Sequence, residues 1–311
     1  MKQVVKIWFL VVAMVMGGAL PPLVMDNSTI TTQWSAQAKS KKKSKKSRQS
    51  RQSKKSRTSS APASPLVSVP TIGKAAKATT TVPQQHHNSL LAVTIPKGTS
   101  NQVLNYQSIR VNFNPSLRIP NCVAYELTAT MVAMADAPGH EVRKNYNYSR
   151  DANVKSCPDN WEYRGSGYSR GHMAPAMDMR WDKTAMKQCF YMTNMCPQET
   201  KLNNDHWRVL EEKVHRWAKR DKRLLVYTGP IMGKSPKMIG KDKPNIAVPD
   251  AFFKVIYAPD QGRAIAFIYP NAPCPGGIKK YAVTVAEVER RTGLAFSASI
   301  PKRQCRIEDW E

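Results

Sequence analysis

The chain has 311 residues, an apolar fraction of 41% and a formal net charge of +26. The length allows one large domain with a tail or two modest domains, and the apolar fraction excludes a chain too polar to build a packed core. No acidic residue occurs between Asp26 and Glu126, so the excess charge lies in the N-terminal part. Because Lys and Arg displace condensed counterions from phosphates, this charge favours a nucleic-acid partner. A solvated tail that only keeps the protein soluble is the alternative.

The first residues predict an exported protein. Lys2 and Lys6 precede an apolar run over residues 7–20, which is short for a membrane span. A positive flank before a short apolar stretch is typical of a secretory signal peptide, here residues 1–25, with the cleavage site left open. We therefore expect a secreted, periplasmic or cell-surface protein. An uncleaved membrane anchor is the alternative.

Residues 26–99 are expected to form a basic arm and a linker. Residues 39–57 consist of Lys, Arg, Ser and Gln alone. Such a stretch cannot bury apolar surface to offset its ordering entropy, so we expect disorder. The residues that follow, to about position 85, are rich in Ala, Pro, Ser and Thr and are typical of an extended linker. The arm is expected to bind polyanions or a cell surface.

Residues 100–311 are expected to form the catalytic domain, with an α+β fold. Runs rich in β-branched and aromatic residues predict strands at residues 122–128, 190–193, 224–228, 251–257 and 264–269. Between residues 203 and 221, apolar side chains recur at three- and four-residue intervals, which predicts an amphipathic helix. A second helix is expected at residues 284–291, with Thr284 as its N-cap.

The chain has six cysteines, all beyond the basic arm. An even number in an exported protein predicts up to three disulfides, and the sequence does not choose among the possible pairings. Free buried thiols are the alternative. The six are Cys122, Cys157, Cys189, Cys196, Cys274 and Cys305.

Three segments concentrate side chains suited to cutting a phosphodiester: residues 163–175, 190–198 and 202–211. The reaction needs a base to take a proton from water and positive charge at the phosphoryl oxygens. A neutral imidazole such as His172 suits the first task near pH 7. The planar guanidinium of Arg170 matches phosphate oxygens. A hard cation such as Mg²⁺ prefers oxygen ligands.

The spacing of two side chains on the expected helix predicts how a single metal is held. If Asn203 opens the helix, its amide oxygen can point from the first turn toward the ion. Glu211 lies eight residues on, roughly 12 Å along the axis. We therefore expect Asn203 to bind the ion directly and Glu211 to act through a water molecule. Asn203 as a helix cap alone is the alternative.

These segments resemble the DNA/RNA non-specific endonucleases of the ββα-metal class. The family's Asp-Arg-Gly-His hallmark is matched by Ser169-Arg170-Gly171-His172, and the spacing from Asn194 through Pro197-Gln198 to Asn203, Trp207 and Glu211 fits the family pattern. The resemblance covers residues 120–300, most closely 163–211. It implies a His-Me finger fold in which helices flank a central antiparallel sheet.

The resemblance also implies roles for matching positions. His172 would be the general base, and Arg170 would contact the phosphate. Asn203 would be the single protein ligand to Mg²⁺, for which Mn²⁺ can substitute, with Glu211 on the ion's water. The implied activity is hydrolysis of DNA and RNA to products with 5′-phosphate ends, with no small-molecule cofactor.

Two further positions are assigned by the resemblance. Arg143 would be a second phosphate-stabilising arginine, and Asn194 an asparagine that supports the site. The departure from the family pattern is Ser169, which stands where the family has aspartate and carries no negative charge.

Two other interpretations of the chain remain open. A catalytically silent, exported nucleic-acid-binding protein on a degenerate nuclease fold is favoured by Ser169. A surface-attachment protein that depends on its arm is favoured by the basic stretch at residues 39–57.

Overall fold

The computed structural model describes residues 89–311. The expected signal peptide and most of the expected arm lie outside these described residues. A short 3₁₀-helix, η2 (Ser89–Leu91), opens the described part, and Leu91 and Val93 are buried. Packed structure is thus present ahead of residue 100, where the sequence placed the start of the domain.

The domain is built on a seven-stranded sheet in the order β1-β2-β3-β6-β9-β10-β11, with every neighbouring pair antiparallel. Its strands are β1 (Gln102–Asn105), β2 (Arg110–Asn114), β3 (Ile119–Thr128), β6 (Arg223–Ile231), β9 (Ala251–Ala258), β10 (Arg263–Pro270) and β11 (Ala282–Val283). All eight residues of β9 are buried, as expected for a central strand covered on both faces. The prediction of an α+β fold with a central antiparallel sheet is confirmed.

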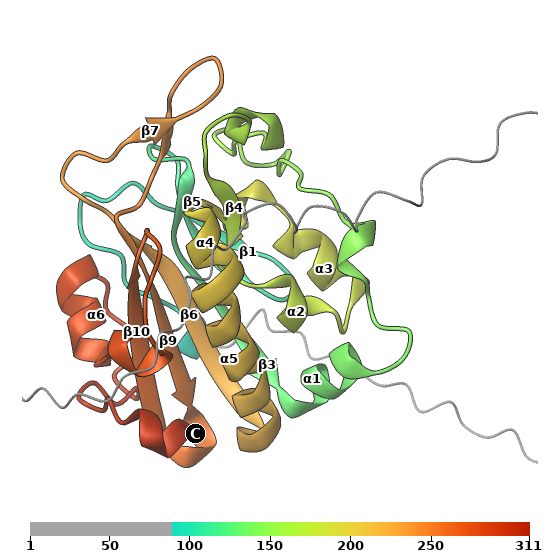
Figure 1. The fold of residues 1–311 in the computed structure, drawn as a ribbon, viewed down its shortest axis with the longest axis vertical. Helices are drawn as coiled ribbons and strands as arrows, with labels where there is room; N and C mark the ends of the chain where they lie inside the picture. The colour runs from blue at the N-terminus through green and yellow to red at the C-terminus, as the bar shows by residue number, and fades with distance from the viewer. Residues whose placement is uncertain (1–88) are drawn as a thin grey trace, which may run out of the picture. The chain divides into compact units, whose positions relative to one another are not determined.

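Helices cover the two faces of this sheet unequally (Figure 1). One face packs against the largest core cluster, together with α1 (Ala129–Asp136), α2 (Ala176–Met179), α3 (Lys183–Cys189) and α5 (Arg208–Asp221). The other face packs against α6 (Val285–Thr292) and the segment around Leu91. Alternate residues of the central strands enter the two cores, as the two-residue period of a strand requires.

A two-stranded antiparallel sheet, called the hairpin below, lies beside the large sheet and shares its main core. The chain forms α2 and α3 between its two strands. β4 (Ser169–His172) pairs with β5 (Met195–Gln198) in antiparallel register. The chain then continues through α4 (Thr200–Leu202), a π-helical turn labelled η6 (Asn203–Trp207), and α5. Two strands followed by a helix are the ββα unit that the resemblance implied.

Short elements complete the described part. The 3₁₀-helices are η3 (Arg143–Asn145), η4 (Asn160–Tyr163), η5 (Met192–Asn194), η7 (Pro259–Gln261), η8 (Ile278–Tyr281) and η9 (Ile307–Trp310). A two-stranded ribbon joins β7 (Met238–Ile239) to β8 (Ile246–Ala247).

Most of the expected elements are confirmed, and one is wrong. The strands expected in β3, β6, β9 and β10 are present, and Thr284 caps α6 by accepting a hydrogen bond from Glu287 N at 3.1 Å. Residues 190–193 are not a strand: Phe190 ends α3, and η5 begins at Met192. Their apolar character reflects burial against the core rather than pairing in the sheet.

The disulfide prediction is also wrong, because all six cysteines are free thiols. They are spread through the fold: Cys122 belongs to the core on the α6 side of the sheet, and Cys196 to the core on the opposite side. Burial raises the pKa of the Cys157 thiol to about 11. Buried thiols of this kind are unreactive and behave as small apolar side chains.

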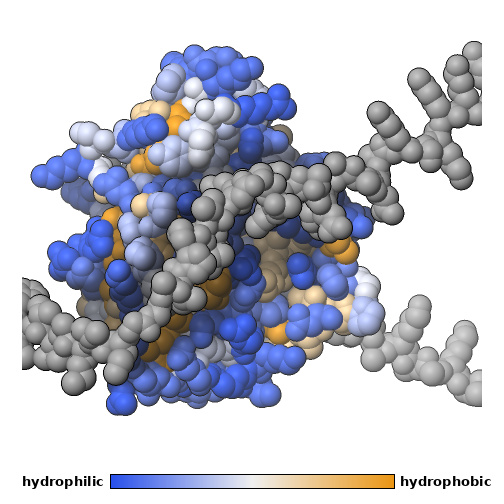
Figure 2. Space-filling view, viewed as in Figure 1, coloured by the Kyte–Doolittle hydropathy of each residue, from blue (hydrophilic) through white to orange (hydrophobic). Residues whose placement is uncertain are grey.

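The surface seen in Figure 2 is largely hydrophilic, with apolar side chains in smaller patches between polar ones. Among the described residues, the exposed large apolar side chains are those of Val103, Val142 and Trp161. Within the same range, no helix has both the length and the apolar character that spanning a membrane requires.

Candidate active site

A pocket of about 190 Å³ lies between the hairpin and the start of the long helix. It brings together five side chains that the sequence singled out from three separate stretches of the chain. These are Arg143, Arg170, His172, Asn203 and Glu211. Residues far apart in sequence share this cavity because the ββα unit folds the helix back across the hairpin.

His172 stands at the wall of the pocket with a free ring nitrogen. It is the last residue of β4, where it pairs with Met195, and it is 8% exposed. Its ring centroid lies 4.9 Å from that of Phe190, edge to face. Burial, reinforced by the positive charge of Arg143, lowers the pKa of His172 to about 3. Its Nε2 atom is shielded from solvent and has no hydrogen-bond partner. His172 therefore lines the pocket as a neutral imidazole.

Two arginines are held around the imidazole by aromatic rings and neutral acceptors. Arg170 donates a hydrogen bond to the backbone oxygen of Asn160 at 2.6 Å, and its guanidinium lies 5.5 Å from the Tyr163 ring. Arg143 donates to the Tyr148 hydroxyl at 3.0 Å. None of these partners is anionic, so both guanidinium groups keep their positive charge available to an anion.

Asn194 does not line the pocket but holds the segment that follows the histidine. Its side chain accepts a hydrogen bond from Ala174 N at 2.9 Å and donates to the backbone oxygens of Ala174 and Cys189 at 2.9 and 2.8 Å. The side chain is fully buried. Asn194 therefore holds the loop after His172 in place, and its supporting role at the site stays a prediction.

Asn203 does reach the pocket, but it does not open the helix. Glu199 is the N-cap of α4, where its carboxylate accepts from Leu202 N at 2.7 Å. Asn203 instead begins the π-helical turn that ends at Trp207. Such turns are rare and are frequently found at functional sites. Asn203 is not an N-cap, because Glu199 caps the start of α4, and Asn203 lies at the C-terminal end of α4. Its role as a metal ligand stays a prediction.

Glu211 lies on the first turn of α5, with one carboxylate oxygen shielded from water. Its Oε1 atom is buried and has no hydrogen-bond partner. Burial raises the pKa of Glu211, the charge of Lys254 opposes that shift, and the charge of Asp178 adds to it. A buried carboxylate oxygen without a donor is costly unless a cation or water meets it.

The donor set of the pocket fits a hydrated divalent cation. The carboxylate of Glu211 and the amide of Asn203 offer the hard oxygen atoms that Mg²⁺ prefers while it keeps several of its waters. In the described residues, the pocket included, no group of three or more His, Cys, Asp or Glu side chains could hold a metal ion, so an ion in the pocket would depend on the Asn203 amide and on water.

Four other residues line the pocket that sequence reasoning did not assign: Tyr148, Pro175, Asn204 and Arg208. Arg208 is the most consequential, because it adds a third guanidinium. Its Nε atom donates to the backbone oxygen of Asn204 at 2.8 Å, and it pairs with Glu212. Arg208 precedes Glu211 by three residues, which places both side chains on the same face of the helix. This spacing would have identified Arg208 as a residue of the site.

Ser169, the departure from the family motif, does not line the pocket. Its hydroxyl lies 3.1 Å from that of Thr200 in α4. This contact joins the hairpin to the helix that leads into Asn203. Ser169 thus contributes a neutral link between two parts of the site.

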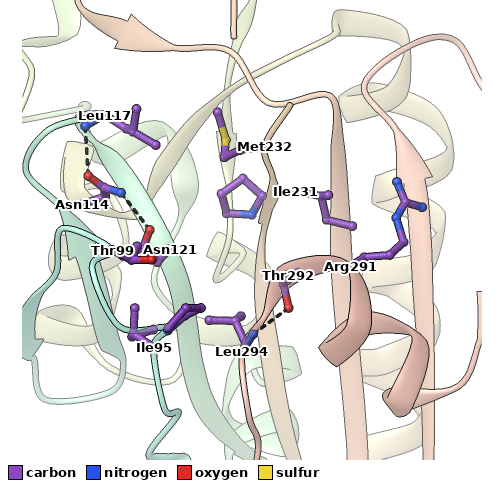
Figure 3. A pocket seen from close by; sticks show the side chains of 12 residues that line it. Ile95, Thr99, Asn114, Leu117, Asn121, Ile231, Met232, Arg291, Thr292 and Leu294 are labelled. Carbon is purple, nitrogen blue, oxygen red and sulfur yellow. Dashed lines mark hydrogen bonds between the residues drawn. The ribbon is translucent and has the colours of Figure 1, made fainter. Parts of the chain in front are cut away.

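A second hollow, of about 230 Å³, lies between the segment around Ile95, the end of β6 and the end of α6. Figure 3 shows its largely apolar lining, with the guanidinium of Arg291 pointing away from the other labelled side chains. Its polar side chains include Asn114 and Asn121, which are hydrogen-bonded to each other at 3.0 Å, and it contains no histidine or carboxylate. The pocket around His172 is therefore the candidate active site.

The ββα unit, with its terminal histidine, its asparagine and its arginines, defines a nuclease of the ββα-metal class. The model of the family described as DNA/RNA non-specific endonuclease matches residues 86–303. This match covers more than half of the chain, and the chain belongs to that family.

Individual relatives agree with this assignment. The chain is 36% identical over 178 residues to human "Endonuclease G, mitochondrial", covering 52% of this chain and 59% of the relative. It is 36% identical over 159 residues to Schizosaccharomyces pombe "Nuclease 1, mitochondrial", covering 45% and 49%. A crystal structure of an EndoG/EndoGI complex matches with a TM-score of 0.58 at 28% identity, over 63% of this chain and 85% of that one.

Two facts limit what can be inferred about this chain from these relatives. The matched part spans only about half to three fifths of the length of these two curated relatives. Both are named as mitochondrial proteins. These names contradict the predicted secreted, periplasmic or cell-surface location, which rested on the composition of residues 1–25. A short apolar run after two lysines was too weak a pattern to assign a compartment.

Proposed function

We propose that this chain is an endonuclease that hydrolyses phosphodiester bonds in both DNA and RNA. The observation that carries the proposal is the neutral side chain of His172, which lines one pocket with Arg143, Arg170 and Glu211. Membership of the DNA/RNA non-specific endonuclease family supports it. So do the relatives, which are named as nucleases.

His172 acts as the general base. Its neutral ring takes one proton from a water molecule through a ring nitrogen as the water oxygen attacks phosphorus. The bond from phosphorus to O3′ breaks on the opposite side, and O3′ takes a proton from solvent water and leaves as a hydroxyl. The phosphate stays on the other fragment, which therefore carries a 5′-phosphate end. The low pKa of His172 keeps the ring in its proton-accepting form.

Arg143 and Arg170 bind the phosphate and oppose the negative charge that builds on its oxygens. The Asn203 amide would hold a Mg²⁺ ion, for which Mn²⁺ could substitute, and Glu211 would support it through water. The ion would supply further positive charge at the phosphate. The site needs no organic cofactor. Because these groups contact the backbone of the nucleic acid, they impose little sequence preference.

We further propose that residues 89–311 form the catalytic domain and that the basic stretch at residues 39–57 increases affinity for nucleic acid. Lys and Arg in that stretch carry no base specificity, but they release counterions from any polyphosphate. The arm thus increases the affinity for nucleic acid, and the pocket carries out the cleavage.

Divalent-ion dependence tests the enzymatic proposal against a silent binding protein. The purified chain is expected to nick plasmid DNA and degrade RNA with Mg²⁺, to stop when EDTA is added, and to resume with excess Mg²⁺ or Mn²⁺. Asn203→Ala is expected to lower both activities by well over about 10-fold. Asn105→Ala, on the exposed edge strand β1, is the matched control. Binding of DNA without cleavage under any divalent ion would favour the silent binding protein.

A further inference from the structure

Lys254 is a fully buried lysine directly behind the catalytic pocket. It lies in β9 with no exposed surface and pairs across the sheet with Thr228 of β6. Its Nζ atom donates a hydrogen bond to the Thr228 hydroxyl at 2.9 Å. That hydroxyl is neutral, so the charge of a buried ammonium must be compensated elsewhere.

The ammonium group also lies 4.7 Å from the centre of the Trp207 indole ring. Cations are attracted to the face of an aromatic ring at this separation, most strongly to tryptophan and in a site without water. Trp207 is the last residue of the π-helical turn that begins at Asn203. Lys254 thus anchors one end of the turn whose other end enters the pocket.

Two carboxylates act electrostatically on the ammonium, those of Glu211 and Asp178. Asp178 is already engaged, because it accepts from the Tyr125 hydroxyl at 2.8 Å and lies 2.9 Å from Nδ1 of His215. Glu211 has the shielded Oε1 atom without a hydrogen-bond partner. The carboxylate left to balance Lys254 is therefore the one at the back of the pocket.

We propose that Lys254 is a positioning residue for the divalent-ion site. One ammonium fixes the turn that carries Asn203, through its contact with Trp207, and acts on the Glu211 carboxylate by its charge. Lys254 does not line the pocket, so it touches neither substrate nor ion. This inference rests on the proposed roles of Asn203 and Glu211, and it adds that the affinity of the site for the ion depends on a residue of the central sheet.

Binding of Mn²⁺ to the full chain without nucleic acid, followed by electron paramagnetic resonance, tests the inference. Lys254→Met keeps the length of the side chain and removes its charge, and it is expected to raise the Mn²⁺ dissociation constant about 10-fold or more. Lys254→Arg keeps the charge and is expected to lose less affinity. Lys237→Met is the matched control, because Lys237 is exposed and lies over Tyr168 away from the pocket.

The dependence of cleavage on metal separates positioning from a general structural role. Lys254→Met is expected to need more Mg²⁺ for half-maximal cleavage and to approach the wild-type rate when Mg²⁺ saturates. A folded variant with wild-type Mn²⁺ affinity, or a rate that saturating Mg²⁺ does not restore, would overturn the inference. If the wild-type chain itself neither binds Mn²⁺ nor cleaves, the proposed function fails instead.

A pair of Trp207 variants tests the same link if Lys254→Met does not fold. Trp207→Phe keeps an aromatic ring beneath the ammonium, whereas Trp207→Leu keeps only apolar volume. We expect weaker Mn²⁺ binding in the leucine variant than in the phenylalanine variant. Equal affinities in the two variants would contradict the role assigned to Lys254.

Discussion

Three side chains of the pocket each leave one buried polar atom without a protein partner: Nε of Arg170, Nε2 of His172 and Oε1 of Glu211. A buried unsatisfied group costs roughly 1–3 kcal/mol of folding free energy. The same holds for buried atoms outside the pocket, such as Nε1 of Trp207 and the hydroxyl of Tyr269. The pocket differs in that three such atoms belong to side chains that line one cavity.

The state of His172 is directly measurable by NMR. Burial disfavours the charged ring and lowers its pKa from 6.5 to about 3, so the ring stays neutral when the pH falls through 6.5. We expect its ring resonances, identified as those lost in His172→Ala, to remain unchanged between pH 8 and pH 5. A titration with a midpoint near pH 6.5 would show that the ring is exposed to water rather than buried.

Replacing Asn194 with alanine removes three hydrogen bonds at once and leaves backbone groups of Ala174 and Cys189 unsatisfied. We expect Asn194→Ala to lower the free energy of unfolding by about 3 kcal/mol or more, since each buried group left unpaired costs roughly 1–3 kcal/mol. Urea denaturation measures the difference. An unfolding curve that matches the wild type would mean that the loop after His172 is held by other contacts.

The sequence predicted four residues of the pocket: His172, Arg170, Asn203 and Glu211. They could be predicted because cutting a phosphodiester restricts which side chains can act as base, phosphate contact or metal ligand. Lys254 was missed although its sequence context held a signal. Lys254 shares one face of a strand with Phe252 and Ile256. A lysine among such buried apolar residues is almost never found without a partner for its charge. Its contact with Trp207 depends on tertiary packing, which no local pattern contains.

At the scale of elements, the hairpin and the π-helical turn determine the geometry of the site. The sequence predicted a helix from Asn203 because the apolar period becomes clear only there. The helix that Glu199 caps, α4, has three residues. This length is too short to produce a periodic apolar pattern in the sequence. The strand expected at residues 190–193 failed for a related reason, since a short apolar run cannot distinguish a strand from a buried helix end.

The close contact between the two strands of the hairpin requires glycine at position 171. A Cβ atom on Gly171 would lie 2.2 Å from Oε1 of Gln198 and 2.6 Å from its Cβ atom. Gly171→Ala is expected to destabilise the fold by about 1–3 kcal/mol and to displace His172. Its single-turnover cleavage rate should fall more than about 10-fold, as a small displacement of a reacting group can do.

A second glycine provides the control for this substitution. Gly277 has an ordinary backbone conformation, and no atom lies within 4 Å of the position that a Cβ atom would occupy there. Gly277→Ala is expected to unfold and cleave like the wild type. Equal behaviour of the two alanine variants would show that the hairpin can open to admit a side chain.

At the scale of the molecule, one antiparallel sheet separates two cores, and the site lies on the side covered by α5. Four of the seven strands were predicted because they are long and apolar. The edge strand β1 and the two-residue strand β11 were not, since none of their residues is buried. β2 was missed as well, although four of its five residues are buried, because its polar residues interrupt the apolar run. Local patterns do not contain the order of the strands, because that order depends on pairing between residues far apart in the chain.

The separation of arm and domain predicts how salt affects the protein. Deleting residues 39–60 is expected to leave cleavage at low salt largely intact, because the pocket is untouched. The logarithm of the binding constant for DNA should then fall less steeply with the logarithm of salt concentration, since fewer counterions are released. Fluorescence anisotropy at several salt concentrations measures both slopes. Identical slopes would mean that the arm does not contact the nucleic acid.

The role of His172 in activating the attacking water is tested most directly by the single-turnover cleavage rate of His172→Ala at saturating Mg²⁺. We expect a loss of about 10²- to 10⁴-fold, the usual contribution of a general base, in a variant that still binds DNA and Mn²⁺. His140→Ala, which lies outside the pocket, should cleave at the wild-type rate. Cleavage by His172→Ala at the wild-type rate would contradict this role.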